Sequence, residues 1–186
     1  MVIRKTATAE LERVEIPTKD ELLRRARFIA AVGKFTKLDD STYSLEAEET
    51  DGAATKTTLK QNAFKQISCN CALFLQEGAM KHRNYRCEHK LALRIYKMLP
   101  EMPENIRFNP LAQTVSELVG TEQLTILRKL AKNLGLKNID QSSRAVLGCG
   151  YDECSREAAQ FLIDYLIEIQ GFEAGVSDEN IGKKTV

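Results

Sequence analysis

The 186-residue sequence has no run of about eighteen apolar residues, the length that a membrane-spanning helix needs. It also lacks a secretion signal, because Arg4 and Lys5 are followed by Glu10, Glu12 and Glu15 rather than by an apolar stretch. These two absences predict a cytoplasmic protein that has no membrane partner. Only five cysteines are present, and an odd number suits a reducing compartment in which thiols bind metal instead of pairing.

The sequence also lacks the motifs of common enzyme classes. It has no phosphate-binding loop, no G-x-S-x-G and no H-E-x-x-H. A large net charge is missing as well, since 27 basic and 26 acidic residues leave a formal charge of +1. That balance excludes a whole-molecule field strong enough to imply a polyanionic partner. We expect a protein that is not an enzyme.

Cysteine and histidine are scarce but concentrated in one pattern, C-x-C-x15-C-x-H, formed by Cys69, Cys71, Cys87 and His89. Three thiolates and one imidazole are ligands that tetrahedral Zn²⁺ takes in structural sites. Four protein ligands would fill the coordination shell, so the ion would stabilise the fold rather than activate a substrate. The alternative is that Cys69 and Cys71 alternate along a strand as small buried apolar residues, with the other two nearby by chance.

The same residues resemble a SWIM zinc finger, a family defined by C-x-C-x(n)-C-x-H. The four ligands match one by one, Phe74 matches the family's aromatic residue, and residues 91–93 match its helix start. The resemblance covers residues 42–99 and implies a strand before the first pair and a helix that begins at the second. It also implies DNA binding or protein contacts. Glu88 departs from the pattern, because the family commonly has lysine between the last two ligands.

Periodicity and turn residues predict an α+β fold. An N-terminal helix precedes a small antiparallel sheet that carries the zinc finger and its helix, and a small C-terminal helical bundle follows. Thr18 and Glu21 have capping-box spacing at the start of the first helix, and Gly33 ends it. Strands are expected over residues 35–38, 42–47, 55–59 and 64–68. Further helices are expected over residues 91–99, 112–119, 121–134, 139–147 and 155–170.

Three prolines, Pro100, Pro103 and Pro110, interrupt the chain between the finger and the C-terminal helices, and they predict a linker. After the last helix, periodicity is lost and Gly, Ser, Asp and Lys become frequent, which predicts disorder. The expected organisation is an N-terminal arm and helix over residues 1–33, the sheet with the finger over 34–99, the linker over 100–110, a helical domain over 111–170 and a disordered tail over 171–186.

The C-terminal helices are similar to a small helical module that is appended to phage- and plasmid-type DNA recombination and annealing proteins. The matching positions are Gln123, Leu127, Leu130, Leu134, Gly135, Gly150, Glu157, Ala158 and residues 162–164. Most of these positions are also what any three-helix unit needs. The resemblance implies a role in DNA recombination or repair.

Charge is unevenly distributed along the chain. Residues 53–97 contain nine basic and two acidic residues, which leaves a formal charge of +7. We expect this segment to bind nucleic acid, DNA rather than RNA, by neutralising phosphates and stacking an aromatic side chain on a base. The expected contact residues are Lys81, Arg83, Tyr85, Arg86, Lys90 and Arg94. Alternatively, the basic residues are a solvated face, and the chain is a protein-interaction adaptor whose zinc finger is purely structural.

The two remaining cysteines, Cys149 and Cys154, lie outside the ligand pattern. No histidine is near them in the sequence. Without a base, a cationic neighbour or two further ligands, we interpret them as ordinary cysteines at a helix junction. His82, in the basic loop, is interpreted as a solvated side chain.

Overall fold

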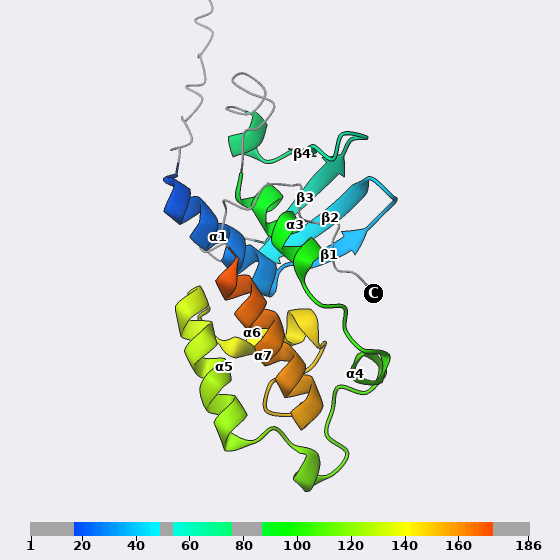
Figure 1. Ribbon diagram of the computed structural model, residues 1–186, viewed down its shortest axis with the longest axis vertical. Helices are drawn as coiled ribbons and strands as arrows, with labels where there is room; N and C mark the ends of the chain where they lie inside the picture. Colours follow the sequence, from blue (N-terminus) through cyan, green and yellow to red (C-terminus); the bar gives the residue numbers. More distant parts are fainter. Residues whose placement is uncertain (1–16, 49–53, 76–86, 173–186) are drawn as a thin grey trace, which may run out of the picture.

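The computed structural model of the chain describes residues 17–48, 54–75 and 87–172, and it confirms the predicted α+β class (Figure 1). The elements, in chain order, are α1 (Lys19–Val32), β1 (Lys34–Lys37), β2 (Thr42–Glu48), β3 (Ala54–Gln61), β4 (Ile67–Cys69), α3 (Glu88–Met98), α4 (Glu104–Phe108), η2 (Val115–Glu117), α5 (Thr121–Leu134), α6 (Ile139–Val146) and α7 (Arg156–Gly171). Figure 1 shows the sheet and α3 at one end of the molecule and α5, α6 and α7 at the other. Helix α1 packs against both groups.

The four strands form one antiparallel sheet in the order β1-β2-β3-β4. Because side chains alternate along a strand, each row of paired residues faces one side of the sheet. Leu59 pairs with Cys69, and both are buried, as is Leu45, on the side that packs against α1 and α3. The next row, Lys60 and Ser68, faces the opposite side and is exposed. The apolar rows therefore hold the sheet against the helices, and the polar rows form its second face.

Helix α1 is positioned by its two ends. Thr18 Oγ1 accepts a hydrogen bond from Glu21 N at 3.2 Å, which confirms the predicted start of the helix. At the other end, a Cβ added to Gly33 would lie 2.7 Å from Leu45 Cδ1 and 2.5 Å from Ile29 O. The turn from α1 into β1 therefore requires glycine, because only glycine lets the backbone approach β2 so closely.

Helices α5, α6 and α7 form the second half of the fold, with α5 packed against α7. The bounds of α5 match the helix predicted over residues 121–134, and Gly135 follows it with φ of +73°. Leu127 of α5 and Leu162 and Leu166 of α7 are fully buried. Their apolar faces enclose a small helical core, as the periodicity predicts.

The helix predicted over residues 112–119 is wrong. Within this segment the only helical turn is the short 3₁₀ turn η2. The backbone pairs instead with the segment that leads into α7: Ala112 N donates to Glu153 O and Val119 N donates to Cys154 O, each at 3.1 Å. These long-range hydrogen bonds satisfy backbone groups that a helix would otherwise pair locally, and periodicity carries no information about them.

The strand predicted over residues 64–68 begins later in the chain, as β4. Residues 62–66 form the turn between β3 and β4, because Asn62 Oδ1 accepts hydrogen bonds from Phe64 N at 3.0 Å and from Gln66 N at 2.9 Å. Asparagine favours turns through such side-chain contacts with the backbone. Phe64, which the sequence pattern places inside the strand, is 83% exposed.

One continuous core joins the two ends of the molecule. Buried side chains from α1, the sheet, α3 and the C-terminal helices belong to the same cluster. Buried Ser142 Oγ donates a hydrogen bond to Ala31 O at 2.7 Å, which links α6 to α1. The predicted linker, residues 100–110, contains α4, in which Ile106 is buried. The division into domains stays a prediction, and α1 contributes to the core on both sides of it.

The two ends of the chain are described only in part. Gly171, the first residue of the predicted tail, is the last residue of α7, and Phe172 O accepts a hydrogen bond from Arg27 Nη2 at 2.5 Å. Residues 1–16 of the predicted N-terminal arm and residues 173–186 of the predicted tail lie outside the described residues.

Candidate metal centre

Two elements position the four predicted ligands. Strand β4 ends at Cys69, and Cys71 follows where the chain turns and Phe74 N donates to Cys71 Sγ at 3.4 Å. Cys87 is the N-cap of α3, so His89 falls in the first turn of that helix. In a straight strand, side chains two residues apart would share a face but point in parallel. The turn after β4 and the start of α3 instead aim both pairs at one place.

The four ligand atoms, three sulfurs and one imidazole nitrogen, all lie within 4.8 Å of one another. In a tetrahedral site with Zn–S bonds of about 2.3 Å, the sulfurs are about 3.8 Å apart. The cluster is therefore close to the size that a bound Zn²⁺ requires. Within the described residues, it is the one group of three or more cysteine, histidine or acidic side chains arranged to hold a metal ion.

Protein surrounds the cluster on most sides. Cys69, Cys87 and His89 are buried, and Cys71 is half-buried. Burying polar and ionisable groups is costly unless they gain compensating interactions. Part of that compensation is visible, because Cys71 N donates to Cys69 Sγ at 3.4 Å. A divalent ion bound by all four side chains would supply the rest.

One buried nitrogen tests the fit to a metal. His89 Nδ1 is buried and has no hydrogen-bond partner among the described residues. Buried polar atoms are normally paired, so this imidazole is accounted for if its ring binds an ion. Glu88 Oε1 lies 3.9 Å from Nδ1, and Glu88 Oε2 is likewise buried without a partner in the described part of the chain. The residues present therefore fit Zn²⁺, with a carboxylate beside the ligating histidine.

The ionisation of the ligands is strongly coupled. Hydrogen bonds with Cys69 and Cys87 lower the pKa of Cys71, whereas hydrogen bonds with Cys69 and Cys71, together with burial, raise the pKa of Cys87. Burial lowers the pKa of His89, but contacts with the thiols of Cys69 and Cys71 outweigh it and raise this pKa to about 10. Without a metal, protons on Cys87 and His89 therefore limit the negative charge of the cluster. A bound divalent cation would replace these protons.

Sequence reasoning missed how Glu88 and Lys90 sit beside the ligands. Lys90 is only 4% exposed, and its Nζ lies 4.9 Å from the centroid of the Phe74 ring. A cation over an aromatic face is a favourable contact. This position suits packing against the centre better than contact with a phosphate. The only feature of the sequence that could have indicated this position is that both residues are next to a predicted ligand, His89, in the first turn of a helix.

The other predicted nucleic-acid contacts are placed only in part. Arg94 is half-buried on α3. Lys81, Arg83, Tyr85 and Arg86 lie outside the described residues. Their contact with nucleic acid stays a prediction.

Cys149 and Cys154 are buried free thiols that belong to no metal-binding group found in the described residues. Cys154 Sγ donates to Tyr151 O at 3.1 Å. Burial is the main cause that raises the pKa of Cys154 to about 11, so its thiol is protonated near neutral pH. Such a thiol packs as a small apolar side chain and is a poor nucleophile.

Comparisons of the chain with models of protein families, with curated proteins and with solved structures found no match. In the described part of the chain, no helix has the length and apolar character needed to cross a membrane. What stands is a cluster of three cysteines and one histidine that could hold a metal ion and is compatible with a zinc finger.

Proposed function

We propose that this chain is a cytoplasmic, zinc-binding accessory protein that binds nucleic acid. The observation that carries the proposal is the convergence of Cys69, Cys71, Cys87 and His89 within 4.8 Å. Four protein ligands fill a tetrahedral shell, so the ion has a structural role and the protein is not a zinc enzyme. The metal would supply four bonds that tie the end of β4 to the start of α3.

The order of elements around the cluster supports a finger of the SWIM type. Strand β4 precedes the first pair of ligands, and α3 begins directly after Cys87. Both are what the resemblance implies. Phe74, the aromatic residue of the match, lies under the ammonium of Lys90 beside the centre.

The nucleic-acid part of the proposal rests on charge. Residues 53–97 carry a formal charge of +7, and in the described part of this segment Lys56, Lys60 and Lys65 are exposed. Clustered cations release counterions when they neutralise phosphates, which gives affinity that falls steeply with salt. The resemblance of the C-terminal helices favours DNA as the nucleic acid and recombination or repair as the process.

A protein-interaction adaptor is the second candidate function. A groove of about 360 Å³ between α3 and α7 is lined mainly by apolar side chains, among which Met98 and Ile167 are exposed. Exposed apolar grooves suit protein contacts. In this second function the metal only stabilises the fold. The formal net charge of +1 is consistent with a partner that is not a polyanion.

Binding of short single- and double-stranded DNA over a range of salt concentrations tests these candidates. Replacing Lys81, Arg83 and Arg86 together by glutamine should reduce the slope of log affinity against log salt by about two to three units, because three phosphate contacts are lost. The matched control replaces three exposed lysines of the helical half, Lys129, Lys132 and Lys137. Absence of DNA binding by the parent protein at low salt would favour the adaptor.

A further inference from the structure

The charged side chains of the β3–β4 hairpin are all basic. Its span, residues 54–69, contains Lys56, Lys60 and Lys65 and no acidic residue. Phe64 stands at its tip and is 83% exposed. An exposed ring offers a flat apolar face on which a nucleic-acid base can stack. The hairpin therefore combines cations with an exposed aromatic face.

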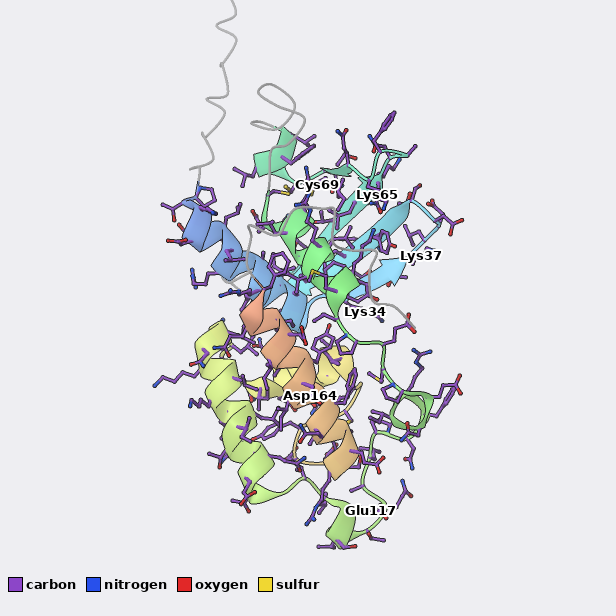
Figure 2. The ribbon with its side chains drawn as sticks, viewed as in Figure 1. Lys34, Lys37, Lys65, Cys69, Glu117 and Asp164 are labelled. Atoms are coloured by element: carbon purple, nitrogen blue, oxygen red, sulfur yellow. The ribbon has the colours of Figure 1, made fainter. Side chains whose placement is uncertain are left out.

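Hydrogen bonds to Asn62 shape the backbone at the tip of the hairpin. Asn62 Oδ1 accepts hydrogen bonds from Phe64 N and from Gln66 N, and Asn62 O accepts one from Lys65 N at 2.9 Å. Lys65 has φ of +59°, which is uncommon for a residue other than glycine. The turn thus keeps an unfavourable backbone conformation that projects Lys65 and Phe64 outward. Figure 2 shows Lys65 on the hairpin, at the end of the molecule that carries Cys69 and away from the helical half with Asp164.

Neighbouring charges leave the hairpin positive. Lys60 lies on the polar face of the sheet opposite Ser68, whose hydroxyl donates to Lys60 O at 3.3 Å. The adjacent β1–β2 turn brings two carboxylates close, since Gln61 N donates to Ser41 O at 2.7 Å. One of them, Asp40, is paired with Lys37 at 2.8 Å. On the neighbouring strand β2, Glu46 pairs with Lys56 at 3.0 Å. Lys60 and Lys65 then face Asp39, so the hairpin keeps an excess of positive charge.

We propose that the β3–β4 hairpin is a contact for single-stranded nucleic acid, in which Phe64 stacks on a base while Lys60 and Lys65 neutralise phosphates. This inference rests on the proposed nucleic-acid function and adds contact residues that the sequence analysis does not predict. An aromatic side chain beside cations is the arrangement that sequence-tolerant single-strand binding uses. The base must be unpaired, because the faces of paired bases are covered by their neighbours in the stack.

A protein partner fits this surface less well. Docking surfaces for proteins present contiguous apolar area. The other residues of the turn, Asn62, Ala63, Lys65 and Gln66, are all exposed, and only Ala63 is apolar. One isolated ring is sufficient for stacking on a base. An apolar partner would gain no favourable contact from the lysines, whereas a phosphate backbone would be neutralised by them.

The first test replaces Phe64 by alanine in the zinc-loaded full chain and measures binding of a fluorescent oligothymidine by anisotropy. Loss of one stacked base should weaken affinity about 5- to 150-fold and leave the salt slope unchanged. Phe108→Ala is the matched control, because Phe108 is also strongly exposed, at 81%, but lies on α4. It should bind as the parent does. Both substitutions remove exposed rings, so melting temperatures should stay close to that of the parent.

The second test separates charge from stacking. Replacing Lys60 and Lys65 together by glutamine should reduce the salt slope by about 1.4 units on single strands, while the Lys129 and Lys132 double replacement should not change it. If the parent binds the oligonucleotide and Phe64→Ala binds it equally well, the hairpin is not the contact. Nucleic-acid binding by the protein would still be supported. If the parent binds no oligonucleotide at low salt, both the hairpin inference and the proposed function are overturned. Loss of self-association in Phe64→Ala, without nucleic-acid binding by the parent, would make the hairpin a protein contact instead.

Discussion

Among single residues, spacing reveals the four side chains of the candidate metal centre but not the position of a fifth, Glu88. The pattern C-x-C-x15-C-x-H singles out Cys69, Cys71, Cys87 and His89, because zinc chemistry restricts both the residue types and their number. Spacing carries no such information about Glu88, whose carboxylate oxygen lies 3.9 Å from His89 Nδ1. That distance is set by how α3 begins, which the pattern does not specify.

Glu88→Gln should weaken Zn²⁺ binding by about 10-fold, because it removes a negative charge that lies 3.9 Å from His89 Nδ1 and favours a cation there. Competition with a chromophoric chelator measures the affinity. Glu122→Gln, in the first turn of α5, is the matched control and should leave the affinity unchanged. Equal affinities for Glu88→Gln and the parent would show that Glu88 does not support the ligand.

Among the elements, those specified by local signals were predicted well. All four strands form, and α5 has the expected bounds because Gly135 ends it with a left-handed conformation. Two segments are predicted wrongly because contacts with another segment or with a side chain determine their conformation. Residues 112–119 pair with the backbone before α7, and residues 62–66 are turned by the side chain of Asn62. Helical and strand periodicity describes burial along an element, not hydrogen bonds to another segment.

Gly135→Ala should lower the free energy of unfolding by about 1 kcal/mol, because alanine tolerates the left-handed region poorly. Lack of space is not the cause, since the nearest atom to an added Cβ is 4.0 Å away. Urea unfolding measures the change. Gly171→Ala is the control, because a Cβ added at this last residue of α7 would contact no neighbouring side chain within 4 Å. It should not destabilise the protein. Similar losses in both variants would refute a conformational cause.

For the whole molecule, the position of α1 is what the sequence could not supply. Capping residues predict where the helix starts, but its packing depends on residues more than a hundred positions away, as in the bond from Ser142 Oγ to Ala31 O. Local patterns do not encode such contacts. Helix α1 packs against α3 and also against α6 and α7, so it contributes to the core on both sides of the linker predicted over residues 100–110.

Removal of zinc should therefore destabilise both halves of the fold together. We expect a chelator to lower the melting temperature, with the helical circular dichroism signal still lost in a single transition, because the halves share the core around α1. The same scan without chelator is the reference. Two transitions, with the signal of α5, α6 and α7 surviving the first, would show that the halves are independent domains.

The metal content of the purified protein shows whether Cys69, Cys71, Cys87 and His89 bind one structural zinc ion. Elemental analysis should find one zinc per chain in the parent and in a Cys154→Ser variant, whose substituted thiol lies outside the cluster. A Cys87→Ser variant should lose the zinc, because three remaining ligands hold the ion far less tightly. A well-folded parent without metal, or a zinc content unchanged by Cys87→Ser, would show that these four side chains do not form a structural zinc site.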